Sequence, residues 1–369
     1  MRVLMVPCDL RTGGAEMAAL DLIRALRGRC EFFIAPVRGG GELGEAFVAA
    51  GATVCAPLAR WRYDPGGPFR LAGHLTRHAI DALLVVDVAR NAMFHARAGA
   101  TLCRRRIARV CWCHSVPSPQ AGRFVPRLRR AQQSGRLEAI VLLSRSQRDV
   151  LIAGGVRRRG TVVIPNGVDL SAARTPRGIT LRLPPDKTIV VQVANVMRDK
   201  DFPTLLDAVG RLARTRDDFH LVLVGRGTDS PAMAREVRRA GLEPIATLAG
   251  CRDDVPGILA AADVFVLATR SEVFNRSALE AMAAGLPLVV SDVPGFSEVF
   301  TDEREGLKVA PQRPAALFEA LDTLLGDAAL RDRMSRAARL RARNFSRERM
   351  AEAFERLLTA AVAQVRGRR

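Results

Sequence analysis

The chain has 369 residues, enough for two domains at about 150 residues each, with a core in both. Apolar residues make up 48% and charged residues 26%, which excludes disordered, collagen-like and low-complexity chains. The 57 Lys and Arg against 38 Asp and Glu leave a net charge of +19, although all but three of these cations are Arg, as a GC-rich genome would favour.

Short apolar runs alternate with amphipathic helical stretches along the whole chain, which is the pattern of parallel α/β sheets. In the first half the predicted strands are 3–6, 30–35, 53–56, 82–87, 107–113, 139–143 and 161–164. In the second half they are 188–194, 220–225, 245–249, 264–268, 288–291 and 307–309.

We therefore predict two Rossmann-like, doubly wound α/β domains that face each other across a cleft. The first is an acceptor-binding domain at 1–170, and the second is a donor-binding domain at 187–345. Residues 171–186 are rich in Pro and lack periodicity, as expected for a linker. The apolar stripe of 346–369 predicts a last helix that packs back on the first domain. Ligands bind such sheets at the carboxyl ends of the strands, so we expect the active site in the cleft.

The seven cysteines are scattered and mostly lie in apolar runs, which indicates a reducing compartment. Cys111 and Cys113 lack a second Cys or His pair at a zinc-like spacing, so we expect buried thiols there. The N-terminal apolar run is too short for a signal peptide, and no stretch approaches the roughly 20 apolar residues of a spanning helix. We expect a cytoplasmic protein, with peripheral attachment to the inner face of the cytoplasmic membrane left open.

The strongest motif is the stretch from Glu272 to Gly285. A predicted strand runs into a loop that bears Glu272, and a helix is predicted to start near Ser277, to carry Glu280 and to stop at Gly285. The N-terminus of that helix can bind an anion, because its amides are free and its dipole is positive there. Glu280 can then accept ribose hydroxyls, and Glu272 can face a sugar bonded to the anion.

Taken with four other segments, this stretch resembles the retaining glycosyltransferase family 4, which has the GT-B fold. The five segments are residues 13–16, residues 164–169, Lys200 with the following 205–206, residues 250–256 leading into 262–264, and residues 272–285. Their order and spacing agree with the family over roughly residues 2–360.

The resemblance implies a role for each matched residue. Glu280 would hold the nucleotide ribose, Glu272 would sit against the donor sugar, and Lys200 would neutralise the diphosphate leaving group. His114, at the end of a strand, would contact the donor sugar. The other predicted donor-binding residues are Gly13, Gly14, Asn195, Arg226, Val255, Val273, Phe274, Asn275 and Arg276.

Three positions depart from the family pattern. Asn195 stands where members usually have an Arg five positions before the lysine, Val273 where they often have Gly, and Asn275 where they often have Pro. Arg198 could supply the missing charge, since a guanidinium grips phosphate in bidentate fashion, or it could simply face solvent.

Asp199 and Asp201 flank Lys200 and could be mistaken for a metal motif. Two carboxylates holding Mg²⁺ would compete with this lysine for the same phosphate oxygens. We therefore expect neither a metal nor a cofactor, and a UDP- or GDP-linked sugar as the substrate.

Most of the basic excess lies in the first half, where residues 1–170 carry +14 and the remainder +5. Arg123, Arg127, Arg129 and Arg130 alternate with apolar residues, as in segments that lie on anionic membranes. Contact with an anionic glycan and compositional bias are the alternatives. Aromatic residues are only 5%, which argues against a nucleic-acid partner.

The sequence thus predicts a retaining, metal-independent glycosyltransferase of the hexosyltransferase type. It would move a sugar from a nucleotide diphosphate sugar to a hydroxyl of a glycan or lipid-linked acceptor, as in polysaccharide or lipopolysaccharide biosynthesis. Two alternatives remain: a GT-B nucleotide-sugar epimerase or hydrolase, and a basic protein that binds membranes or nucleic acid.

Overall fold

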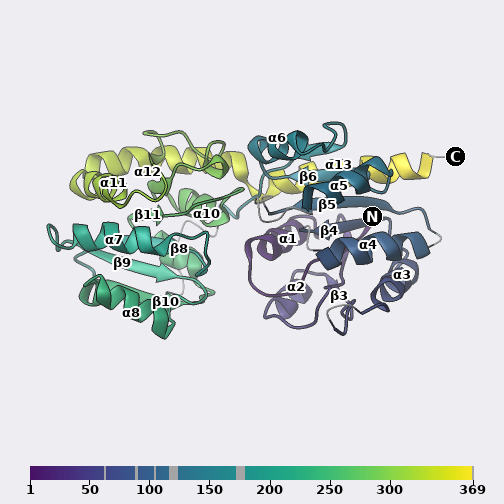
Figure 1. The fold of residues 1–369 in the computed structure, drawn as a ribbon, viewed down its shortest axis with the longest axis horizontal. Helices are drawn as coiled ribbons and strands as arrows, with labels where there is room; N and C mark the ends of the chain where they lie inside the picture. The colour runs from purple at the N-terminus through teal and green to yellow at the C-terminus, as the bar shows by residue number, and fades with distance from the viewer. Residues whose placement is uncertain (62–63, 88–89, 104, 116–123, 172–178, 368–369) are drawn as a thin grey trace. The chain divides into compact units, whose positions relative to one another are not determined.

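The structure is a computed structural model that describes residues 1–369 except 62–63, 88–89, 104, 116–123, 172–178 and 368–369. The chain divides into an N-terminal unit, Met1–Gly167 with Arg347–Arg369, and a C-terminal unit, Val168–Ser346. Each is a parallel sheet with helices on both faces (Figure 1). The described part of the predicted linker at 171–186 belongs to the C-terminal unit.

The N-terminal unit has a seven-stranded sheet in the order β3-β2-β1-β4-β5-β6-β7. Its strands are β1 (Arg2–Val6), β2 (Glu31–Ile34), β3 (Thr53–Val54), β4 (Ala82–Val86), β5 (Ala108–Cys113), β6 (Ala139–Leu142) and β7 (Thr161–Val163). Its helices are α1 (Gly14–Ala25), α2 (Gly44–Ala49), α3 (Gly67–Arg77), α4 (Arg90–Leu102), α5 (Phe124–Gln133), α6 (Arg145–Ala153) and α13 (Arg347–Gly367). The strand order reverses between β1 and β4, and folds of this type bind ligands at the carboxyl ends of the strands where the order reverses.

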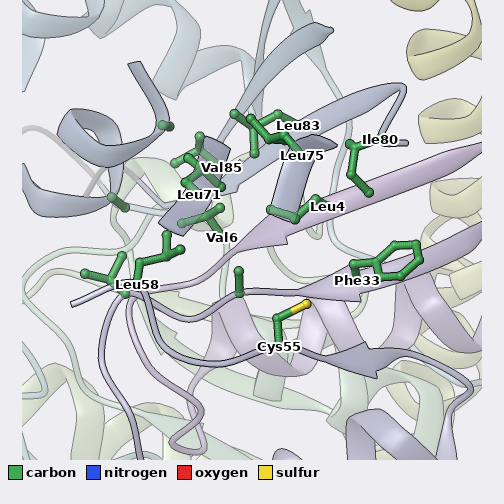
Figure 2. Close-up of a cluster of buried hydrophobic side chains, with 14 of the residues drawn as sticks. Leu4, Val6, Phe33, Cys55, Leu58, Leu71, Leu75, Ile80, Leu83 and Val85 are labelled. Carbon is green, nitrogen blue, oxygen red and sulfur yellow. The ribbon is translucent and has the colours of Figure 1, made fainter. Parts of the chain in front are cut away.

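The core of this unit lies between β1, β2, β4 and the buried face of α3 (Figure 2). Leu71 and Leu75 are four residues apart on α3, so they share the face that meets Leu4 and Leu83 of the sheet. All five residues of β4 are buried, because a parallel strand is covered on both faces. Each such aliphatic side chain contributes about 1.5–3 kcal/mol on burial.

The last helix, α13, packs on α1, β4 and β5 of the N-terminal unit. Its buried stripe includes Phe354, whose ring lies 4.4 Å from that of Trp112 in β5. An ion pair between Arg29 and Glu355 and another between Arg366 and Asp81 join its polar face to the same unit. The tail is therefore an integral part of the N-terminal fold.

The C-terminal unit has a six-stranded sheet in the order β10-β9-β8-β11-β12-β13. Its strands are β8 (Thr188–Val193), β9 (Phe219–Val224), β10 (Ala246–Gly250), β11 (Val264–Leu267), β12 (Leu288–Ser291) and β13 (Gly306–Val309). Its α-helices are α7 (Phe202–Leu212), α8 (Pro231–Arg239), α9 (Val255–Ala260), α10 (Arg276–Ala284), α11 (Pro314–Gly326) and α12 (Ala328–Ala342). Its described residues also form short 3₁₀ helices at η3 (Glu243–Ile245), η4 (Pro294–Phe296) and η5 (Arg343–Phe345).

Every strand that the sequence predicts is present, and the doubly wound α/β class is confirmed in both units. Among the helices of the described residues, none combines the length and apolar character needed to cross a bilayer.

Candidate functional site

The loops that follow β8 and β11 are joined by main-chain pairing in the C-terminal unit. Lys200 pairs with Thr269 as an antiparallel bridge, and the amide of Asp201 donates to the carbonyl of Ala268 at 3.0 Å. These strands are sheet neighbours, so their carboxyl ends meet at one edge. The pairing brings Lys200 to Glu272, which lies 72 residues away in sequence.

Lys200 and Glu272 form a close ion pair in which Nζ donates to Oε1. Their side chains are only 13% and 10% exposed. Burial lowers the pKa of Lys200 to about 8, and the nearby Asp199 carboxylate opposes that shift. The ammonium is therefore costly to keep charged, and a diphosphate would relieve this cost by adding negative charge beside it.

Asn275 both caps helix α10 and holds Glu272. Its Oδ1 accepts from the amide of Ala278 at 2.7 Å, and its Nδ2 donates to Oε1 of Glu272 at 3.0 Å. The helix starts at Arg276, close to the predicted Ser277, but its cap is Asn275 and not Ser277. Asn is as good a cap as Ser, and the extended backbone at Asn275 turns its oxygen toward the free amides. The hydroxyl of Ser277 instead donates to the carbonyl of Val193 at 2.8 Å.

Glu280, the predicted ribose ligand, lies one turn after Arg276 on α10. Nε of Arg276 is 2.8 Å from Oε1 of Glu280, with side-chain exposures of 12% and 25%. Gly285 ends the helix as expected, with a left-handed φ of 89°. Arg276 thus places a cation in the first turn of α10, beside the amides that make this end attractive to an anion.

Asn195 connects two loops rather than contributing charge. Its Oδ1 accepts from the amide of Arg226 at 2.9 Å, which ties the loop after β8 to the loop after β9. The close approach needs Gly225, since a Cβ there would lie 2.2 Å from the carbonyl oxygen of Ala194. The side chain of Arg226 is exposed.

Arg198 is exposed and lines the same hollow as Lys200, a cavity of about 550 Å³. Three further arginines line this hollow: Arg235, Arg239 and Arg270. Arg270 also contacts Asp201 at 3.1 Å, and Asp201 accepts a hydrogen bond from Thr204 at 2.8 Å. These contacts give Asp201 a structural role at the start of α7.

Three predicted donor-binding residues offer little through their side chains. Val273 and Phe274 are 9% and 5% exposed, and the Phe274 ring packs on Phe345 at 5.7 Å. Val255 is the first residue of α9 and is partly buried. The backbone amides of these residues are the groups that could meet a ligand.

In the N-terminal unit, Gly13 caps α1 and Gly14 begins it. A Cβ on Gly13 would lie 2.5 Å from Oε2 of Glu16, because this carboxylate folds back over the helix start. Gly14 is exposed, with no atom within 4 Å of the place where a Cβ would stand. Glycine at both positions leaves the first turn open to close approach.

Acidic residues gather with His114 at the carboxyl ends of β1, β4 and β5. Asp87, which has a positive φ of 62°, accepts from the amide of His114 at 3.4 Å and from Oγ of Ser115 at 2.8 Å. Burial raises the pKa of Glu16 to about 7, and the charges of Asp9 and Asp87 act in the same direction. Sequence reasoning did not single out Glu16 or Asp87, although Glu16 belongs to the matched segment 13–16.

The arginines of α5 do not lie on an amphipathic helix that is free to enter a membrane. Leu128 is fully buried, and Val125 packs against the same core cluster. Arg129 and Arg130 are exposed and Arg127 is partly buried, whereas Arg123 lies outside the described residues. The described apolar side chains of this helix therefore pack on the unit's own core, and contact of its arginines with an anionic membrane stays a prediction.

Comparison with known families gives two matches. The Glycosyltransferase Family 4 family matches residues 12–172, and the Glycosyl transferases group 1 family matches residues 180–341. Together the two matches cover most of the chain, with one family on each half.

Curated relatives share about a third of the aligned residues. D-inositol 3-phosphate glycosyltransferase of Xylanimonas cellulosilytica is 30% identical over 261 residues, 65% of this chain and 60% of the relative. Glycogen synthase of Mycobacterium tuberculosis is 32% identical over 185 residues, 48% of this chain and 43% of the relative. The lipopolysaccharide core biosynthesis mannosyltransferase LpsB of Rhizobium meliloti is 31% identical over 197 residues, which are 48% of this chain and 56% of the relative. The chain spans about half the length of the curated relatives it matches.

Solved structures match over nearly the whole chain. Anabaena Alr3699/HepE, crystallised with UDP and glucose, superposes with a TM-score of 0.80 at 20% identity, covering 98% of this chain and 100% of that one. Sucrose-phosphate synthase from Thermosynechococcus elongatus superposes with a TM-score of 0.81 at 20% identity, covering 99% of this chain and 100% of that one. At this identity the likeness concerns the fold.

Proposed function

This chain belongs to the GT-B glycosyltransferases, and from that premise we propose that it is a hexosyltransferase that moves a sugar from a nucleotide diphosphate sugar to a hydroxyl of a glycan or lipid-linked acceptor. The observation that carries the proposal is the buried pair of Lys200 and Glu272 beside the N-terminus of α10. Anabaena HepE, of the same fold, has been crystallised with UDP-glucose, which supports a nucleotide-sugar donor.

The diphosphate would lie between Lys200 and the first turn of α10. The Lys200 ammonium exchanges part of its contact with Glu272 for phosphate oxygens, and the free amides of α10 add hydrogen bonds. Both act on charge that grows as the bond to the sugar breaks, so they stabilise the transition state more than the bound donor. Arg198 and Arg276 would add further positive charge near the diphosphate.

Glu272 would orient the donor sugar through its hydroxyls, and Asn275 keeps that carboxylate in place. Glu280 would accept hydrogen bonds from the ribose hydroxyls. Arg276 would then leave its ion pair with Glu280 and contact the phosphates. The two cations exchange carboxylate for phosphate oxygens, and the two carboxylates exchange a cation for hydroxyl donors, so every buried charge keeps hydrogen-bond partners.

We propose that the reaction retains the anomeric configuration. The bond between the sugar C1 and the phosphate oxygen breaks, the acceptor oxygen bonds C1 from the same face, and the acceptor proton passes to the departing phosphate. A lysine, helix amides and arginines supply the stabilising charge, so the proposed reaction requires neither a metal nor a cofactor.

Turnover with a panel of UDP-, GDP- and ADP-sugars and a hydroxyl acceptor tests this function. We expect transfer from one donor class, a product of unchanged anomeric configuration by NMR, and no effect of EDTA. Conversion of the donor to an epimer or to free sugar at the same rate without acceptor would establish the epimerase or hydrolase alternative instead.

We further propose a cytoplasmic enzyme whose N-terminal unit meets anionic membranes by charge alone. The exposed Arg129 and Arg130, together with the exposed run 157–159, support this. Replacing these arginines by Gln should reduce binding to vesicles that contain anionic lipid, and binding to neutral vesicles should be weak throughout. Equal binding to both kinds of vesicle contradicts an electrostatic attachment.

A further inference from the structure

Three metal-ligating side chains converge at the β3 edge of the N-terminal sheet, outside the residues considered above. Cys55 follows β3 directly, and His74 and His78 lie at the carboxyl end of α3. The Cys55 sulfur and one nitrogen of each imidazole all lie within 4.8 Å of one another. Figure 2 shows Cys55 at the edge of the core cluster that also holds Phe33.

The two histidines are placed together by the helix itself. Residues four apart share a helix face, and helical His pairs at this spacing are common metal ligands. Here the rings of His74 and His78 stand nearly parallel, 17° apart, with centroids separated by 6.0 Å. The ring of Phe33 packs on His78 at 4.5 Å, which covers one side of the pair.

Two further features suit coordination. The ring of His74 donates a hydrogen bond to the carbonyl of Ala56, which holds its tautomer and leaves the other nitrogen as an acceptor, as in most metal-bound histidines. Cys55 is a free thiol, 9% exposed, with a sulfur that only weakly contacts the carbonyl of Thr53 at 4.0 Å.

We propose that Cys55, His74 and His78 bind a zinc ion, with water as the fourth ligand. Neighbouring ligand atoms of a tetrahedral zinc site lie roughly 3.3–3.7 Å apart, so small side-chain rotations would close this cluster around the metal. Binding converts the Cys55 thiol to a thiolate and releases its proton to solvent.

The metal would stabilise the β3 edge of the N-terminal sheet, where the strand is very short. Strand β3 has only two residues and pairs with β2 alone, whereas α3 is anchored by its own buried face. A zinc ion shared between Cys55 and the two histidines connects the edge to the helix. This role is structural and does not depend on the proposed transfer reaction.

Titration of the tag-free, full-length protein with Co²⁺ tests the site. We expect one equivalent to bind, with the thiolate-to-cobalt charge-transfer band and the visible bands of tetrahedral cobalt, and Zn²⁺ to displace it. Cys55→Ser should abolish the charge-transfer band, and Cys251→Ser, which removes an exposed thiol of the other unit, should leave it unchanged.

His78→Gln provides a second variant in case Cys55→Ser does not fold. It should weaken Co²⁺ binding at least tenfold and remove the increase in melting temperature that Zn²⁺ gives the wild-type protein. Absence of a charge-transfer band in the wild-type protein, or an equal band in Cys55→Ser, overturns the proposal.

Discussion

The two units each gather charged side chains at the carboxyl ends of their strands, but they balance those charges differently. In the C-terminal unit Lys200 meets Glu272 and Arg276 meets Glu280. In the N-terminal unit Glu16 is partly buried and lies near two other carboxylates, so its pKa rises to about 7. A site of paired charges can bind a charged ligand by exchanging partners, whereas a cluster of like charges responds by taking up a proton.

Lys200→Ala should cause the largest loss, because it removes the cation from the proposed leaving-group site. We expect kcat to fall about 10³-fold, comparable with the removal of an oxyanion-hole donor. Arg198→Ala is the control, since it removes an exposed cation from the same hollow, and it should cost less than about tenfold, as for a contact in high dielectric. A larger loss in Arg198→Ala would reverse this ranking.

The variant Asn275→Asp keeps the hydrogen bond that caps α10 but removes the hydrogen bond to Glu272. Aspartate caps as well as asparagine, so the contribution of the cap should be kept, but aspartate cannot donate to Glu272 and it repels that carboxylate. Misplacement of Glu272 should lower kcat about 10- to 100-fold. Asn275→Ala loses the cap as well and should also cost about 1 kcal/mol of stability. Unchanged kcat in Asn275→Asp argues against the positioning role.

The pH dependence of turnover follows from the pKa of Lys200, about 8. The protonated lysine is the active form, so kcat/KM for the donor should fall about tenfold between pH 7 and pH 9. The bound diphosphate favours the ammonium, so kcat should decline only at higher pH. In Lys200→Arg the side chain stays charged throughout. Its kcat/KM should be lower than that of the wild-type enzyme but constant between pH 7 and pH 9. If kcat/KM of the wild-type enzyme does not change with pH over this range, the protonation of Lys200 does not control the reaction.

Glu16→Gln should have the smallest effect, on stability. The carboxyl has a pKa of about 7 in the fold against 4.5 for an unperturbed glutamate, so its contribution to stability is complete below pH 4.5 and is lost as the pH rises through 7. At pH 8 the Gln variant should be more stable by about 1 kcal/mol, after discounting for partial exposure, with no gain at pH 4.5. Denaturation at both pH values measures this. Glu45→Gln, an exposed carboxyl in the first turn of α2, is the control.

Sequence patterns located the strands and the principal motif, but they did not show which groups the motif residues and the apolar helix faces contact. The Glu272–Gly285 stretch reads correctly as a loop followed by a helix that ends at Gly285. The sequence predicts a helix start near Ser277, but Asn275 and Ser277 both suit the cap position and only backbone geometry distinguishes them. The arginines around Leu128 suggested a membrane face because periodicity shows that a helix has an apolar side, not what covers it.

The sequence by itself determined the α/β class, the two sheets and the placement of the motif residues at strand ends. Parallel strands are buried on both faces, so their apolar runs stand out against the helices between them. Only the tertiary structure decided which of these ends are neighbours. Because β8 lies beside β11, Lys200 meets Glu272, and because α3 lies beside the β3 edge, its histidines meet Cys55. Such long-range pairings depend on strand order, which local periodicity does not carry.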